Sequence, residues 1–143
     1  EDLVPVASDL VAAGDLEFFG RPEWVTLQET YQIDFAEKLT FAPSLMYTAV
    51  DERQVDVIAA YTSDGRIAAY DLLILEDPRN AVLPYDSILL ASGSAAENTV
   101  FMKAMEALIN KISDEEMRQA NRIVDVDGRP ISDAVNYLKS VID

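Results

Sequence analysis

Hydrophobic and polar positions along the 143 residues follow two periods, one typical of buried strands and one typical of amphipathic helices. Short apolar runs bounded by Gly, Pro or acidic residues predict strands, whereas apolar residues three and four positions apart predict helices. The predicted strands are residues 11–13, 38–41, 55–61, 72–75 and 87–91. Short helices are predicted over residues 2–10, interrupted by Pro5, and over residues 66–70. Longer helices are predicted from Pro22 through Tyr31 and over residues 43–53, 95–111, 114–124 and 131–141.

Local signals support several of these boundaries. Pro22 suits the first position of a helix, and Ser113 with Glu116 forms a capping box that begins another. Asp64 is expected to cap the short helix that follows it. The side chains expected in the core are Trp24, Leu27, Tyr31, Leu45, Met46, Tyr47 and Val50.

The order of the elements predicts the fold class. Strands alternate with helices over the first part of the chain, which favours an α/β fold with a largely parallel sheet. The three C-terminal helices depart from that alternation. A change of layer, or of lobe, near residues 80–86 would explain the departure.

The charge balance limits the partners. Lys and Arg number 11 and Asp and Glu number 26, a formal charge of −15. Such a chain is poorly suited to nucleic acid or anionic membrane, because both attract a surplus of basic residues. A cationic partner is compatible with the charge, although a solvated acidic surface is the simpler explanation.

Absent residue types exclude several kinds of chemistry. The sequence has neither Cys nor His, which removes Cys–His and Ser–His catalysis and thiolate or imidazole zinc sites. Asp125-Val126-Asp127-Gly128 is a fragment of a calcium-loop pattern without the rest of its ligands, and it predicts a turn between helices. We therefore expect no cofactor, no metal site and no enzymatic activity.

Four blocks of sequence resemble the substrate-binding proteins of ABC importers for glycine betaine, carnitine and choline. They are residues 17–23 (Glu-Phe-Phe-Gly-Arg-Pro-Glu), 55–67 (Val-Asp-Val-Ile-Ala-Ala-Tyr-Thr-Ser-Asp-Gly-Arg-Ile), 75–85 (Leu-Glu-Asp to Leu-Pro-Tyr) and 111–125. The resemblance covers nearly the whole chain in the order of the family, and its most specific part is Tyr61-Thr62-Ser63-Asp64-Gly65-Arg66-Ile67.

The resemblance implies a fold, a ligand and a site. The fold is a lobe of a type II periplasmic binding protein, whose ligand sits between two lobes. Tyr61 and Tyr85 match two tyrosines that enclose the trimethylammonium head of the ligand, and Arg21 matches the group that holds its carboxylate. Glu17 matches a position that touches the cationic head through its backbone.

Physical chemistry supports those residue types independently. A quaternary ammonium group has no N–H, so aromatic faces and dispersion must recognise it, at roughly 0.5–2 kcal/mol for each desolvated face. An arginine offers a carboxylate a planar, permanently charged pair of donors. Without the resemblance, Tyr61 would be a strand-end aromatic, Arg21 a surface arginine beside a proline, and Glu17 a solvated loop acid.

The resemblance also implies that this chain is part of a larger receptor. Residues 1–84 correspond to the second lobe, and residues 85–143 to a crossover strand and C-terminal helices that partly belong to the first lobe. We expect the chain alone to bind betaine weakly. Its C-terminal third would expose apolar residues that either fold back or associate with another copy; they include Ile88, Leu89, Phe101, Met105 and Leu108.

The predicted function is an extracytoplasmic receptor that passes its ligand to an ABC permease. The sequence leaves open whether that receptor is free, lipid-anchored or fused to the permease. A protein–protein interaction or regulatory module on the same fold is the main alternative. A carboxylate-based hydrolase is a weaker third candidate.

Overall fold

The computed structural model describes residues 1–142, and the chain divides into two compact units. Unit 1 contains Glu1–Tyr61 and Tyr70–Pro84, and unit 2 contains Thr62–Ala69 and the chain from Tyr85 onward. Each unit is therefore built from two separate stretches of sequence.

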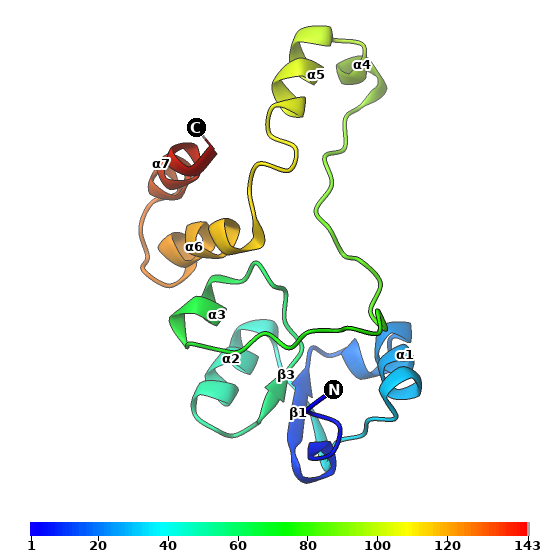
Figure 1. The fold of residues 1–143 in the computed structure, drawn as a ribbon. Helices are drawn as coiled ribbons and strands as arrows, with labels where there is room; N and C mark the ends of the chain where they lie inside the picture. The colour runs from blue at the N-terminus through cyan, green and yellow to red at the C-terminus, as the bar shows by residue number, and fades with distance from the viewer. Residues whose placement is uncertain (143) are drawn as a thin grey trace. The chain divides into compact units, whose positions relative to one another are not determined.

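Unit 1 is organised around a parallel sheet of three strands, shown in Figure 1. The strands are β1 (Val11–Gly14), β2 (Glu37–Thr40) and β3 (Val57–Ile58), in the order β2-β1-β3. In the central strand, Ala12 lies opposite Lys38 on one side and Val57 on the other. The predicted α/β class with a parallel sheet is confirmed.

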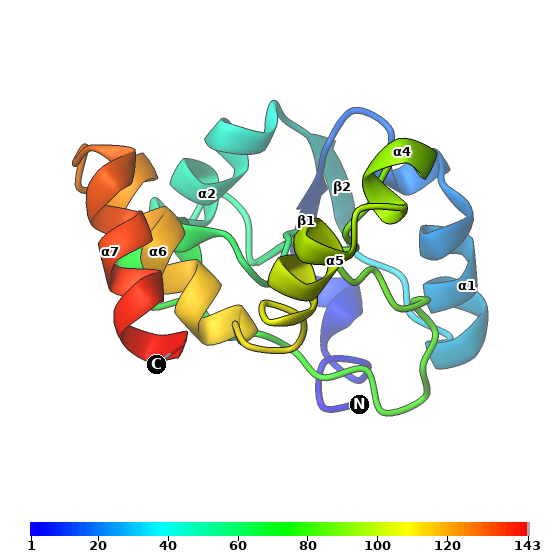
Figure 2. The same ribbon diagram turned by 90° about the horizontal axis from the view of Figure 1, so that it is seen from above.

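Two helices connect these strands. Helix α1 (Pro22–Tyr31) joins β1 to β2, and helix α2 (Pro43–Asp51) joins β2 to β3. Proline occupies the first turn of both, where the missing N–H has no helical partner to lose. The connection through α1 leads from β1 to β2, and the connection through α2 leads back across β1 to β3, in the opposite direction. Right-handed crossovers in opposite directions place the two helices on opposite faces of the sheet. Figures 1 and 2 both show α1 and α2 on either side of β1.

The core of unit 1 accordingly forms two clusters. One contains Ala7, Tyr31, Ile33 and Ala81 beside α1, and the other contains Ala13, Met46, Ala49 and Val55 beside α2. Trp24, Tyr31 and Tyr47 are buried, as predicted. Leu45 is 56% exposed, contrary to the prediction, because the buried face of α2 is defined by Met46 and Ala49, three positions apart, and Leu45 lies beside that face.

The return segment of unit 1 is fastened to α1 by a hydrogen-bonded group around Tyr31. The Tyr31 hydroxyl donates to Asp77 Oδ1 at 2.5 Å and accepts the backbone N–H of Arg79 at 3.0 Å. The Arg79 guanidinium lies over the Tyr31 ring and also donates to Glu1. Burial raises the pKa of Asp77, but hydrogen bonds from Tyr31 and from the N–H groups of Val82, Ala81 and Arg79 outweigh it, so the pKa lies below its usual value.

Two predicted strands are absent from the part of the chain that the structure describes. Residues 72–75 and 87–91 are irregular and pair with no neighbouring strand there. An apolar run becomes a strand only when neighbours complete its hydrogen bonds and cover its faces. Leu73 is instead 84% exposed and Leu90 88% exposed. The prediction of strands at residues 72–75 and 87–91 is therefore wrong.

Unit 2 is helical. Its elements are α3 (Gly65–Ala69), α4 (Gly93–Ala96), α5 (Thr99–Glu106), α6 (Asp114–Asp125) and α7 (Ile131–Ile142). The single helix predicted over residues 95–111 is two helices, because the Asn98 side chain accepts the N–H groups of Val100 and Phe101 and begins a new helix. The predicted capping box of Ser113 and Glu116 is confirmed, and its hydrogen bonds, above all the one from the Ser113 N–H, lower the pKa of Glu116.

The remaining short elements are 3-10 helices. The predicted N-terminal helix is a series of turns that ends in η1 (Ala7–Asp9), and a second one, η2 (Phe18–Gly20), precedes α1. In residues 1–142 the longest helices are too short and too polar to cross a bilayer.

Candidate functional site

The candidate site of unit 1 lies where β1 and β3 end. Parallel strands end at the same edge of a sheet, and β1 and β3 are neighbours. From β1 the chain passes through α1 to β2 on one side of β1, and it then passes through α2 to β3 on the other side. The strand order therefore reverses between β1 and β3. Ligands of open α/β sheets bind at such a reversal, outside the carboxyl ends of the strands. Glu17 and Arg21 follow β1, and Tyr61 follows β3.

The loop after β1 is shaped by Asp15. Its carboxylate accepts the backbone N–H groups of Glu17 at 2.9 Å and Phe18 at 2.8 Å, which turns the chain into η2. Gly14 allows this turn, because a Cβ there would lie 2.8 Å from the Cβ of Phe18. The loop therefore has a defined conformation that depends on one small residue and one acid.

A cluster of aromatic side chains packs against the same loop. The ring of Phe19 meets Trp24 edge to face with centroids 5.2 Å apart, and Phe18 lies 6.1 Å from Trp24. Phe35 stacks against Trp24 at 5.9 Å. Since Trp24 is buried in α1, this cluster holds the segment between Glu17 and Arg21 against the helix.

Arg21 is engaged by two carboxylates of its own loop. Its Nη2 donates to Glu17 Oε2 at 2.9 Å and lies 3.7 Å from Asp15 Oδ2. The hydrogen bond to Glu17 is the main reason that the pKa of Arg21 lies above the usual arginine value, followed by the charge of Asp15. The Tyr61 phenol also raises that pKa, so Tyr61 lies within electrostatic reach of the guanidinium.

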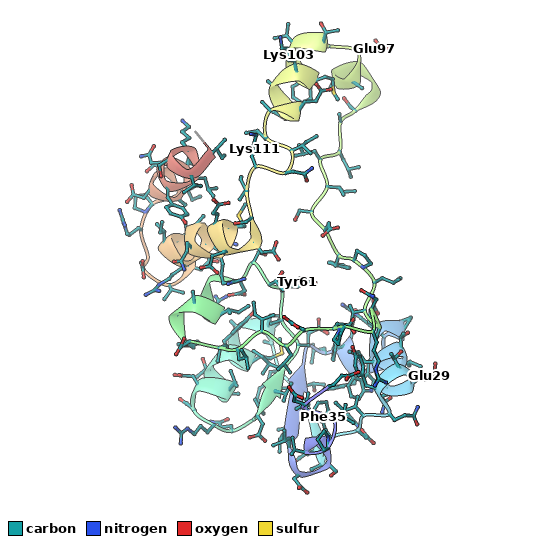
Figure 3. All side chains as sticks on the ribbon, viewed as in Figure 1. Glu29, Phe35, Tyr61, Glu97, Lys103 and Lys111 are labelled. Atoms are coloured by element: carbon teal, nitrogen blue, oxygen red, sulfur yellow. The ribbon has the colours of Figure 1, made fainter. Side chains whose placement is uncertain are left out.

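Tyr61 presents its ring to solvent. The residue is 60% exposed, and Figure 3 labels it on the chain that leaves β3. An exposed phenol within electrostatic reach of an arginine can contact an organic cation without first having to leave a core. Unit 1 thus brings together three of the four predicted site residues: Glu17, Arg21 and Tyr61.

Tyr85 is the fourth predicted residue and belongs to unit 2. It is 75% exposed. It is not among the residues that unit 1 gathers, and its place in one site with Tyr61 stays a prediction.

The charges and donors of the unit 1 site define its chemistry. Asp15, Glu17 and Arg21 sum to −1, which favours a cationic group nearby. Within residues 1–142, no cluster of acidic side chains has the geometry to hold a metal ion. The Asp125–Gly128 segment is a turn in which Gly128 has a positive φ of 65°. The site can therefore offer an aromatic face, a guanidinium and two carboxylates.

Sequence reasoning missed the residues that fasten the Thr62–Gly65 turn. Thr62 donates to Asp114 at 2.6 Å, its carbonyl accepts from Arg118 at 2.8 Å, and Asn121 donates to the carbonyl of Ser63 at 2.8 Å. Asp64 accepts the N–H of Arg66, which agrees with the expected cap. These contacts with α6 fix the backbone immediately after Tyr61.

A signal for this arrangement was present in the sequence. The turn belongs to the block with the most specific family resemblance, and the first half of α6 lies in another of the resembling blocks. Asp15 was also missed as a site residue, although an aspartate two residues before Glu17 is typical of a turn in which the side chain accepts backbone N–H groups.

The chain matches a solved structure of an ABC transporter protein. A crystal structure of a glycine betaine/carnitine/choline ABC transporter superposes with a TM-score of 0.87 at 28% identity, covering 99% of this chain and 54% of that one. The class of protein that the fold defines is thus a periplasmic-binding-protein lobe, as predicted.

The sequence comparisons narrow that class to a family. Residues 1–139 match the OpuAC family, the substrate-binding domain of ABC-type glycine betaine transport systems, and the chain belongs to this family. The carnitine transport binding protein of Listeria monocytogenes is 32% identical over 123 residues, which are 84% of this chain and 40% of that protein. The glycine-betaine-binding protein of Pseudomonas aeruginosa is 27% identical over 132 residues, 89% of this chain and 42% of that protein.

The chain therefore spans about two fifths to one half of the length of these three proteins. The family consists of solute-binding domains of transport systems and not of enzymes.

Proposed function

We propose that this chain is part of an extracytoplasmic receptor for a quaternary ammonium osmolyte such as glycine betaine, carnitine or choline, and that it supplies part of the ligand site. The receptor releases its ligand to an ABC permease and makes or breaks no bond. The observation that carries the proposal is the exposed ring of Tyr61 within electrostatic reach of Arg21 at the carboxyl ends of neighbouring parallel strands.

Each site residue has a role in this proposal. Tyr61 and Tyr85 present aromatic faces to the methylated nitrogen, which cannot form hydrogen bonds. Arg21 binds the ligand carboxylate, because its guanidinium has further N–H donors besides those on Nη2 that meet Glu17 and Asp15. Glu17 touches the cationic head through its backbone, a role taken from the family resemblance.

The predicted affinity of the chain alone is low. Two aromatic faces at about 1–2 kcal/mol each give at most about 4 kcal/mol, which corresponds to a dissociation constant near 1 mM. Micromolar affinity requires about 8 kcal/mol, so further contacts from a first lobe would have to supply the rest.

The test is a titration of the chain with methylated amines up to about 100 mM, in which two-dimensional NMR spectra are recorded at each concentration. We expect glycine betaine, carnitine or choline to shift the signals of Tyr61 and the Arg21 loop. Tyr61→Ala and Tyr85→Ala should each weaken binding by about 1–2 kcal/mol, or roughly five- to thirtyfold. Tyr70→Ala is the matched control, because Tyr70 is a partly exposed tyrosine outside the proposed site.

Two results would contradict the proposal. One is the absence of ligand-induced shifts around Tyr61 at the highest concentration. The other is equal loss of binding in the Tyr70→Ala and Tyr61→Ala variants, which would indicate that the tyrosines act on the fold and not on the ligand.

We propose further that residues 1–84 form the second lobe of the receptor and that residues 85–143 partly complete the first. The apolar residues expected to be uncovered in that case are exposed or half-buried; among them Ile88 is 74% exposed and Leu89 59%. The isolated chain should then either self-associate or keep its C-terminal third folded back and protected from protease. Light scattering that reports a monomer, together with rapid proteolysis after residue 85, would contradict both outcomes.

A further inference from the structure

The guanidinium assigned to the ligand carboxylate already has a carboxylate partner within the chain. Arg21 Nη2 lies 2.9 Å from Glu17 Oε2, a charge-assisted hydrogen bond of ordinary length. The second acid, Asp15, is farther away at 3.7 Å. A carboxylate that approaches Arg21 through Nη2 therefore meets an occupied donor.

The two acids differ in how freely they can move. Asp15 is held by the N–H groups of Glu17 and Phe18, and its side chain is 31% exposed. The Glu17 side chain is 76% exposed, and it accepts a hydrogen bond from Arg21. Glu17 can thus swing into solvent at little cost, whereas moving Asp15 would break the turn that shapes the loop.

We propose, resting on the function proposed above, that Glu17 is a built-in competitor for the ligand carboxylate and sets the preference of this site between carboxylate-bearing and carboxylate-free quaternary ammonium ligands. A glycine betaine carboxylate that takes a bidentate pair of N–H groups including Nη2 displaces Glu17 from Arg21. Choline, which carries a hydroxyl in place of the carboxylate, leaves the Glu17–Arg21 pair intact and faces a loop with a summed charge of −1.

The size of the effect follows from the exposure of the pair. Ion pairs at a solvent-exposed position contribute about 0.2–1 kcal/mol, which is roughly 1.4- to fivefold in affinity. Removal of the Glu17 charge should strengthen glycine betaine binding by that factor. It should also bring the summed charge of Asp15, residue 17 and Arg21 to zero, so choline should bind no more tightly and somewhat more weakly. The two ligands are expected to respond in opposite directions.

The test compares four forms of the chain: wild type, Glu17→Gln, Glu17→Asp and Glu29→Gln. Glu17→Asp keeps the charge but shortens the side chain by one methylene, so it should favour betaine without weakening choline. Glu29→Gln is the control, because it removes the same charge from an exposed position on α1, labelled in Figure 3. Each form is titrated with glycine betaine and with choline and followed by NMR.

A third titrant separates this inference from the proposed function. Acetate carries the carboxylate without the quaternary ammonium group, and the Arg21 Nε–H signal reports its arrival. We expect Glu17→Gln to respond at a severalfold lower acetate concentration than wild type or Glu29→Gln. If that shift occurs but neither osmolyte binds any form, Glu17 competes as inferred and the osmolyte assignment is wrong. The inference is overturned if the Glu17→Gln and Glu29→Gln variants respond at the same acetate concentration and also have the same ratio of glycine betaine affinity to choline affinity.

Discussion

Replacement of Gly65 by alanine tests how tightly α3 packs on α6. A Cβ at this position would lie 2.3 Å from the backbone nitrogen of Arg122 and 2.5 Å from its Cα. Ordinary van der Waals contact begins at 3.4 Å, so the nitrogen contact is short by 3.4 − 2.3 = 1.1 Å. The atoms it meets belong to helix backbone, which cannot turn aside as a flexible side chain can.

The loss of stability follows from how far the added Cβ would push α3 and α6 apart. Overpacking that forces backbone movement costs about 1–3 kcal/mol. A separation of about 1 Å would also break the 2.8 Å hydrogen bond from Asn121 to Ser63, which adds about 1 kcal/mol. Gly65→Ala should therefore destabilise the α3–α6 packing by about 2–4 kcal/mol.

Amide hydrogen exchange followed by mass spectrometry measures that change locally. Exchange that reports opening of α6 should accelerate by roughly 30- to 700-fold, since each 1.4 kcal/mol is a factor of ten. The control is Gly93→Ala in α4 of the same unit, where a Cβ meets no atom within 4 Å and alanine should be neutral or stabilising. Unchanged exchange in α6 of Gly65→Ala would refute the reasoning, because it would mean that α3 and α6 are not in backbone contact.

Three further predictions concern the loop, the return segment and a helix cap. Gly14→Ala should lower the free energy of unfolding by about 1–3 kcal/mol through overpacking against the loop after β1, whereas Gly20→Ala, with open space around it, should be mild; urea titrations that follow Trp24 fluorescence measure both. Asp77 has a lowered pKa, so its stabilisation is complete above its ordinary value near 4 and is lost as the pH falls through its lower folded-state pKa. Asp77→Asn should therefore flatten the acid side of the stability profile, below about pH 5, and an unchanged acid side would count against it. Ser113→Ala should cost about 0.5–2 kcal/mol by removing the cap of α6, seen as faster amide exchange in its first turn; equal protection in the variant would show that the cap is dispensable.

The parts of the fold that the sequence predicted well are those with local physical causes. Gly14 after an apolar run, Pro22 at a helix start and the Ser113–Glu116 box each act within four residues. The elements they mark, β1, α1 and α6, begin or end within a residue of their predicted positions. Local chemistry decides such boundaries, so a sequence pattern is sufficient to find them.

The parts that were missed depend on distant neighbours. The apolar runs at residues 72–75 and 87–91 have strand-like composition, but a strand also needs a hydrogen-bonding partner, and residues 1–142 provide none for them. The same holds for the site. Arg21 and Tyr61 were predicted as separate family matches, whereas the pairing of Arg21 with Glu17 and Asp15 depends on the conformation of a loop that sequence spacing leaves open.

The division of the chain between its two units determines how the protein should respond to truncation and to a single proteolytic cleavage. The polypeptide passes from one unit to the other at residues 61/62, 69/70 and 84/85. Neither unit is encoded by one uninterrupted stretch, so a simple truncation at any of these positions leaves at least one unit incomplete. A single nick at one crossing, by contrast, leaves two covalent connections, and the nicked protein should migrate as one species until it is denatured.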